Sequence, residues 1–188
     1  MAQAVFLDRD GTINEEMGYI NHLSRFRLLP GSAEGIALLN QAGLTVVVAT
    51  NQSGVARKYF PASLIDQVHG LMRDLLAQHG ARLDAIYVCQ HGPEAGCPCR
   101  KPRPGLVQQA AADLSLDLAH SYVVGDRFND IHLAADVGAK GILVLTGYGR
   151  GELENYQGER LAQPAYIATD LLDAAAWIVH DVADFKIR

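Results

Sequence analysis

Short apolar runs recur along this 188-residue chain, and segments with helical periodicity separate them. The runs lie at residues 4–7, 44–49, 85–88, 121–124 and 141–145, and a shorter one lies at 166–168. Each is continuous rather than alternating, which is typical of strands buried on both faces of a parallel sheet. Strands that alternate with helices predict an α/β fold, with a Rossmann-like, mainly parallel sheet flanked by helices and joined by right-handed crossovers.

The segments between these runs differ in regularity. Apolar residues at helical spacing predict helices at residues 31–41, 61–79, 104–114 and 130–137, and a last helix after Asp170 as its N-cap. Residues 15–29 lack a clean period and predict a loop or small hairpin over the end of the first strand, and residues 147–164 are also expected to be irregular. We expect His69, His79, His120, His132 and His180 to lie at helix surfaces or ends, without a functional role.

Length and charge limit the possible functions. A chain of this length with 49% hydrophobic residues suits one well-cored domain, here residues 1–188. A net charge of −5 argues against broad binding of nucleic acid or of an anionic membrane. No apolar stretch is long enough to cross a bilayer, and no basic leader precedes the first run. We therefore expect a cytoplasmic monomer whose partner is a small molecule.

Polar side chains of different kinds follow four of the predicted strands. They are Asp8 and Asp10 after the first, Thr50 at the end of the second, Lys101 beyond the third, and Asp126 and Asp130 after the fourth. Because carboxyl ends of parallel strands share one edge of a sheet, these side chains should meet. A carboxylate nucleophile, a hydroxyl donor, a fixed cation and a second acidic cluster suit phosphoryl transfer through an aspartyl-phosphate with Mg²⁺. Each residue alone has a simpler explanation, as a turn residue, a cap, a solvated cation or an acid at a helix N-terminus.

A second cluster lies within an eleven-residue segment. It contains all three cysteines of the chain and one histidine, namely Cys89, His91, Cys97 and Cys99. Three thiols and an imidazole at this spacing match a closed, tetrahedral zinc site, and a site without an open position is structural. Such a zinc-binding loop at residues 89–99 would aim the next residues, Arg100 and Lys101, at the strand ends. A chance cluster of reduced cysteines, or a redox pair, is the alternative.

The four strand-end motifs resemble those of the haloacid dehalogenase superfamily, in the same order and over nearly the whole chain. The resemblance implies that Asp8 is the nucleophile and that Asp10 protonates the leaving oxygen and then activates water. It further implies that Thr50 and Lys101 bind the phosphoryl oxygens and that Asp130 supports the site by orienting Lys101 or a metal-bound water. Mg²⁺ would be held by the side chains of Asp8 and Asp126 and by the carbonyl of Asp10.

Within this superfamily, the opening motif, residues 50–54 and the zinc loop together resemble the D-glycero-D-manno-heptose 1,7-bisphosphate 7-phosphatases. That resemblance implies substrate contacts from Glu16, Met17, Gly18, Tyr19, Asn51, Gln52, Ser53, Arg100 and Arg127, with Arg100 on the distal phosphate. No segment between Asp10 and Lys101 is large enough to form a separate cap domain, so we expect an open site. Histidinol-phosphate phosphatases share the zinc-containing branch and are the close alternative. A non-catalytic binding protein on the same fold is less favoured, and the net charge disfavours a polynucleotide end phosphatase.

Overall fold

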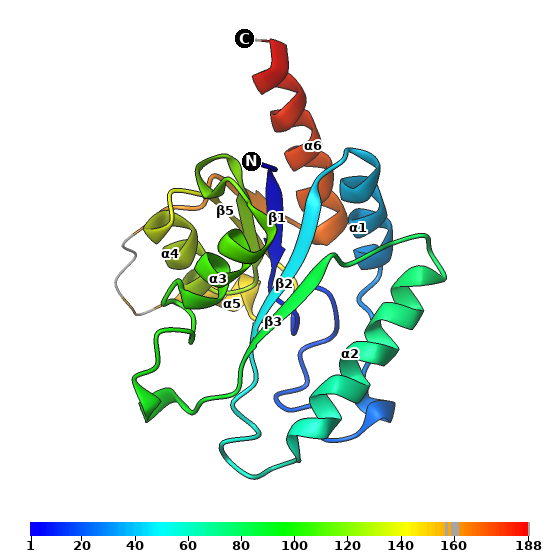
Figure 1. Cartoon of the computed structure of the whole chain (residues 1–188), viewed down its shortest axis with the longest axis vertical. Helices are drawn as coiled ribbons and strands as arrows, with labels where there is room; N and C mark the ends of the chain where they lie inside the picture. Colours follow the sequence, from blue (N-terminus) through cyan, green and yellow to red (C-terminus); the bar gives the residue numbers. More distant parts are fainter. Residues whose placement is uncertain (157, 159–161, 188) are drawn as a thin grey trace.

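The central layer of the protein is a parallel sheet whose strands all end at the same edge. A computed structural model describes residues 1–156, 158 and 162–187, and within them six strands are ordered β3-β2-β1-β4-β5-β6. The strands are β1 (Ala4–Leu7), β2 (Thr45–Asn51), β3 (Ala85–Cys89), β4 (Tyr122–Gly125), β5 (Lys140–Val144) and β6 (Tyr166–Ala168). In register, Phe6 of β1 lies between Val47 of β2 and Val123 of β4. The predicted α/β fold with a parallel sheet is confirmed (Figure 1).

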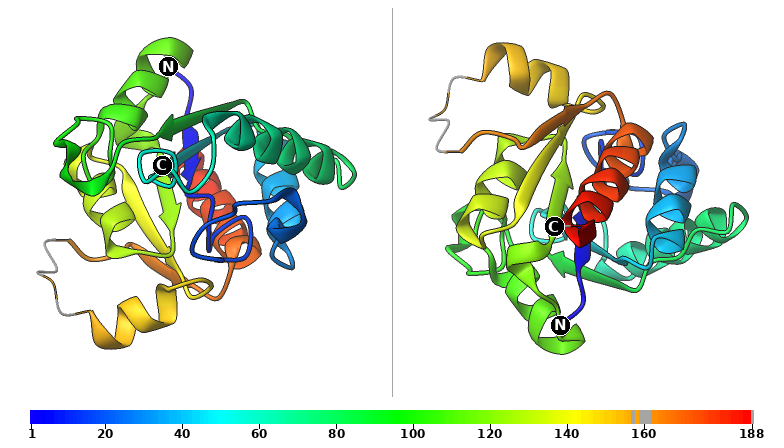
Figure 2. Two further views of the ribbon diagram at one scale, coloured as in Figure 1. Left: turned by 90° about the horizontal axis from the view of Figure 1, so that it is seen from below. Right: turned by 90° about the horizontal axis from the view of Figure 1, so that it is seen from above.

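Helices cover both faces of this sheet because successive residues of a strand point to opposite sides. Val5 and Leu7 of β1 belong to one buried cluster, which α1 (Ser32–Gln41), α2 (Ala62–Ala77) and α6 (Leu171–Ile187) complete. Ala4 and Phe6 belong to the opposite cluster, which α3 (Gly105–Leu114) and α4 (Phe128–Asp136) complete. Figure 2 shows α1 and α6 on one side of the sheet and α3 and α4 on the other.

Two loops project beyond the carboxyl ends of the strands, at the opposite end of the molecule from the termini (Figure 1). Residues 15–29 contain one 3₁₀ turn at Leu23–Arg25, and a bridge between Asn14 and Leu28 closes their base as in a small hairpin. The loop that carries the cysteines contains a 3₁₀ turn at Pro93–Ala95. In the described part of the chain no inserted domain covers the strand ends, as the length of the segment between Asp10 and Lys101 predicted. The site below is therefore open to ligands.

The structure corrects one expectation about local structure. The segment expected to be irregular contains the short helix α5 (Gly149–Asn155); residues 157 and 159–161 of it lie outside the described residues. The sequence of α5 has no apolar stripe, so tertiary contacts define it. A Cβ on Gly149 would lie 1.7 Å from the carbonyl oxygen of Val144, and Glu152 accepts a hydrogen bond of 2.7 Å from the backbone N–H of Phe128.

Two further expectations concern helix residues. The prediction that Asp170 caps the last helix is confirmed, because its carboxylate accepts a 2.9 Å hydrogen bond from the N–H of Asp173. The expectation that His69 and His132 lie at helix surfaces is wrong, since both are buried. No helix among the described residues has the length and apolar character needed to span a bilayer.

Candidate active site

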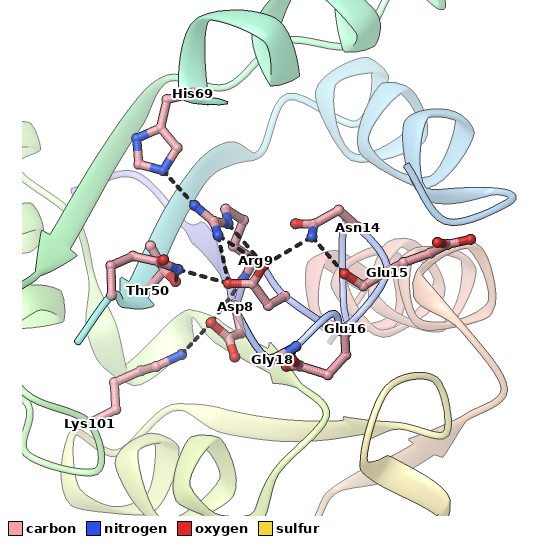
Figure 3. Close-up of polar contacts among 11 residues, drawn as sticks. Asp8, Arg9, Asn14, Glu15, Glu16, Gly18, Thr50, His69 and Lys101 are labelled. Carbon is pink, nitrogen blue, oxygen red and sulfur yellow. Dashed lines mark hydrogen bonds and ion pairs between the residues drawn. The ribbon is translucent and has the colours of Figure 1, made fainter. Parts of the chain in front are cut away.

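Asp8 and Lys101 form the centre of the candidate site at the carboxyl edge of the sheet. The Lys101 Nζ lies 2.8 Å from Oδ1 of Asp8 (Figure 3). It also lies 2.7 Å from Oδ1 of Asp130. The same Asp8 oxygen accepts a 2.8 Å hydrogen bond from the N–H of Arg9, while no donor among the described residues reaches Oδ2. Burial alone would lower the pKa of Lys101, but Asp130 and Asp8 raise it above its usual range. Lys101 is thus a buried, permanent cation beside a carboxylate with one free oxygen.

The backbone of Lys101 is fixed to the end of β2. Asn51 donates a hydrogen bond of 3.2 Å to the Lys101 carbonyl and accepts one of 3.1 Å from the Lys101 N–H. Thr50, one residue earlier, is buried, and its Oγ1 accepts a 3.0 Å hydrogen bond from Gln52. The structure therefore brings together the side chains predicted after the first, second and third strands.

Asp10 is held in place by three donors. Arg9 Nη2 lies 2.8 Å from one carboxylate oxygen of Asp10, Gln52 donates to the same oxygen at 2.7 Å, and Asn14 donates to the other at 2.9 Å. Burial would raise the pKa of Asp10, but the Arg9 guanidinium and these hydrogen bonds hold it below its usual range. Nε2 of His69 lies 3.3 Å from Nη1 of Arg9 (Figure 3).

Sequence analysis missed Arg9, Asn14 and His69. Arg9 is 2% exposed, and a buried guanidinium requires an acid within reach. Its position between two carboxylates at the end of a buried strand was a usable signal. No comparable signal marked His69, because its approach to Arg9 depends on how α2 packs.

The third acid, Asp126, adds to a cluster that can hold a metal ion. Carboxylate oxygens of Asp8, Asp126 and Asp130 all lie within 4.8 Å of one another. When ionised, these three acids and Lys101 leave two negative charges uncompensated. Burial, followed by the charge of Asp8, raises the pKa of Asp126 to about 8. One Asp126 oxygen accepts a 2.8 Å hydrogen bond from the N–H of Tyr148, but Oδ1 is buried without a partner among the described residues. An unpartnered carboxylate oxygen in a cluster with excess negative charge fits a divalent cation.

Two glycines allow the backbone to approach this cluster closely. A Cβ on Gly11, whose φ is +82°, would lie 2.1 Å from Oδ2 of Asp126, and one on Gly147 would lie 2.2 Å from the same oxygen. Thr146 also donates a 2.6 Å hydrogen bond to the carbonyl of Gly11. The segment after β5 therefore contributes to the site, which sequence analysis did not anticipate.

A cavity of about 290 Å³ opens over these residues. Predicted residues in its lining are Asp8, Asp10, Glu16, Gly18, Tyr19, Thr50, Asn51, Gln52, Ser53, Arg100, Lys101, Arg127 and Asp130. Asn129 and Tyr148 also line it and were not predicted. Met17 lies outside the lining, with its side chain packed against the core. Asp126 is buried beneath the floor of the cavity.

The cysteine cluster has the dimensions of a tetrahedral metal site. The Cys99 Sγ lies 3.3 Å from Cys89 Sγ, 3.4 Å from Cys97 Sγ and 3.3 Å from His91 Nδ1, and Cys89 Sγ lies 3.6 Å from Cys97 Sγ. Thiolate and imidazole ligands around one zinc ion lie roughly 3.5–3.8 Å apart. All three cysteines are free thiols in this structure. The geometry fits a closed zinc site better than a disulfide.

Comparison with known proteins places the chain in a family. A HAD-hydrolase-like family model matches residues 98–174. The D-glycero-D-manno-heptose-1,7-bisphosphate 7-phosphatase of Thermosynechococcus vestitus is 44% identical over 96% of this chain and 97% of its own length. The chain belongs to this phosphatase family. A relative from Pseudomonas aeruginosa, the D-glycero-beta-D-manno-heptose-1,7-bisphosphate 7-phosphatase, is 40% identical over 92% of this chain and 95% of that protein.

Solved structures of the family support the same assignment. The D,D-heptose 1,7-bisphosphate phosphatase of B. bronchiseptica, crystallised with magnesium and phosphate, superposes with a TM-score of 0.88 at 40% identity. The match covers 95% of this chain and 99% of that chain. The family therefore shares its fold with the present protein along almost the entire length.

Proposed function

We propose that the protein is a Mg²⁺-dependent phosphatase that hydrolyses the 7-phosphate of D-glycero-D-manno-heptose 1,7-bisphosphate and releases heptose 1-phosphate, for the synthesis of nucleotide-activated heptose. The observation that carries this proposal is Asp8, with one oxygen held by Lys101 and the other free, in an acidic cluster whose oxygens lie close enough together to hold a metal ion. The names of the relatives supply the substrate.

In this proposal Asp8 attacks the phosphorus atom through its free oxygen. The bond from phosphorus to the sugar oxygen breaks, and Asp10 gives a proton to that oxygen. In the second step the Asp10 carboxylate takes a proton from water, whose oxygen attacks the phosphorus atom. The bond from phosphorus to Asp8 breaks, which releases inorganic phosphate and regenerates Asp8. The three donors around Asp10 stabilise its ionised form, which the second step requires, whereas the first step requires Asp10 to carry a proton when the substrate is bound. Lys101 and Thr50 bind the phosphoryl oxygens, where negative charge is highest.

Both metals have candidate ligands. Asp8, Asp126 and the Asp10 carbonyl would hold Mg²⁺, with Asp130 orienting Lys101. Mg²⁺ would supply charge neutralisation between the nucleophile and the phosphate and polarise a phosphoryl oxygen. Zn²⁺ would be structural, held by the four side chains of the loop at residues 89–99. That loop precedes Arg100 and so determines where its side chain enters the cavity.

The remaining lining residues would bind the sugar and the distal phosphate. Arg100 and Arg127 are the cations of the lining other than Lys101, and a guanidinium can contact two phosphate oxygens at once. Glu16, Gly18 and Tyr19 from one loop, and residues 51–53 from another, lie where they could contact sugar hydroxyls. The proposal includes a monomeric enzyme in the cytoplasm, which size-exclusion chromatography with light scattering and cell fractionation would test.

A phosphate-release assay on a substrate panel tests the proposal. The panel contains both anomers of heptose 1,7-bisphosphate, histidinol phosphate and a 3′-phosphorylated DNA, each with and without Mg²⁺. We expect the bisphosphate to have the highest kcat/KM, activity to require Mg²⁺, and Asp8→Asn to abolish turnover. Asp66→Asn, at an exposed position of α2, is the matched control and should retain activity. Faster turnover of histidinol phosphate would refute the substrate assignment, and no turnover of any member would indicate a binding protein.

A further inference from the structure

The ring of Tyr148 stacks against the guanidinium of Arg127 at the edge of the cavity. The Arg127 Cζ lies 3.8 Å from the centroid of the Tyr148 ring, and both residues line the cavity. This distance is well within the range of a cation–π contact. Tyr148 as a whole residue is 43% exposed, so burial in the core does not explain its position.

Arg127 is available for a ligand. In the part of the chain that the structure describes, no carboxylate lies within ion-pair distance of its guanidinium. A ring stacked on the face of a guanidinium leaves the N–H groups at its edge free to donate. A long side chain without an ion pair would otherwise sample several rotamers, so the stacking contact restricts where these donors point.

The backbone of Tyr148 is itself anchored to the acidic cluster. Its N–H donates the 2.8 Å hydrogen bond to Asp126, and its neighbours Gly147 and Gly149 lie too close to surrounding backbone or side-chain atoms to carry a Cβ. Glu152 of α5 accepts from the N–H of Phe128, one residue after Arg127. The segment that carries Tyr148 and the segment that carries Arg127 are therefore hydrogen-bonded to each other on both sides of the stacking contact. The pair is preorganised before the substrate binds.

We propose that Tyr148 is a specificity-determining positioning residue that holds Arg127 in the orientation needed to bind the second phosphate of a bisphosphate substrate. This inference rests on the proposed function, because it adds Arg127 to Arg100 as a cation that binds the second phosphate of the same substrate. It predicts that the ring matters for binding of that anion and that the phenolic hydroxyl does not.

Two variants and a pair of substrates test the inference. Tyr148→Leu removes the ring, and Tyr148→Phe keeps it without the hydroxyl. The substrates are heptose 1,7-bisphosphate and heptose 7-phosphate, which lacks only the distal phosphate. Tyr148→Leu should raise KM for the bisphosphate about threefold to tenfold with a smaller change in kcat, and should affect the 7-phosphate less. Tyr148→Phe should leave KM at the wild-type value.

A double-variant cycle and a spectroscopic measurement complete the test. Once Arg127→Gln is present, Tyr148→Leu should raise the bisphosphate KM no further. In NMR spectra, Arg127 side-chain protons, assigned through Arg127→Gln, should show an upfield ring-current shift that Tyr148→Phe retains and Tyr148→Leu loses.

The possible failures can be told apart. If wild-type protein does not hydrolyse the bisphosphate, the proposed function fails, and the ring-current shift still decides whether Tyr148 positions Arg127. If the bisphosphate is hydrolysed but Tyr148→Leu affects both substrates equally, or Tyr148→Phe behaves like Tyr148→Leu, the inference is overturned. Absence of the ring-current shift in the wild-type protein would also overturn it.

Discussion

Acid should destabilise this protein through His69, which contacts Arg9 beside the proposed catalytic aspartates. The residue is 8% exposed on α2, and its Nε2 lies 3.3 Å from Arg9 Nη1. Because Arg9 can only donate, Nε2 must accept, which requires a neutral ring. Burial lowers the pKa of His69 from 6.5 to about 4, and the positive charge of Arg9 adds to the effect.

The sign of the pH effect follows from proton binding in the two states. Between pH 6.5 and 4 the unfolded chain binds a proton at His69 that the folded protein does not bind, so acidification lowers the free energy of unfolding. Each pKa unit corresponds to about 1.4 kcal/mol. Relative to its value above pH 6.5, the free energy of unfolding is therefore about 2 kcal/mol lower at pH 5 and about 3 kcal/mol lower below pH 4.

Urea unfolding at pH 7 and pH 5 measures this loss. His69→Gln cannot be protonated in this range but can still accept a hydrogen bond from Arg9, so it should lose about 2 kcal/mol less than wild type on acidification. His79→Gln is the matched control, because His79 follows the same helix with its side chain 51% exposed, and it should behave like wild type. If His69→Gln and wild type lose equal stability between these pH values, the buried-histidine argument is wrong.

Three other perturbations probe the site. Gly11→Ala should lower kcat and weaken Mg²⁺ binding, because its Cβ would clash with Asp126. Gly43→Ala is the control, since Gly43 has a similar φ of +77° and no atom within 4 Å of its Cβ position, and it should change stability alone. Titrating the activity with Mg²⁺ separates the two variants. Lys101→Met should lower kcat by about 100-fold or more and destabilise the protein by about 3 kcal/mol, since it leaves buried carboxylates unpaired; kinetics and urea unfolding measure both. Cys97→Ser should lower both the bound zinc content, measured by elemental analysis, and the Tm, measured by calorimetry, and a chelator that removes zinc from the wild-type protein should lower the Tm in the same way. Equal Tm and zinc content in variant and wild type would contradict a structural zinc site.

Local patterns determined much of what this protein is. Apolar runs predicted the six strands, and the polar residues that follow four of them predicted the content of the site, because parallel strands bring their carboxyl ends to one edge whatever their order. The four zinc ligands were equally visible, since they lie within eleven residues and need little tertiary context to meet. Asp170 was recognisable as a cap because capping is a contact between residues three apart.

Only the tertiary structure decided which groups surround the predicted acids. His69 reaches Arg9 across 60 residues of sequence, Thr146 reaches Gly11 across 135, and Tyr148 reaches Asp126 across 22. Such contacts depend on the position of β5 next to β4, with β1 and β4 between β5 and β2, and on how α2 packs over the sheet, which no residue spacing encodes. Residue types at the strand ends thus predicted the chemistry. Long-range packing determined that His69 is neutral, which donors surround Asp10 and which ring stacks on Arg127.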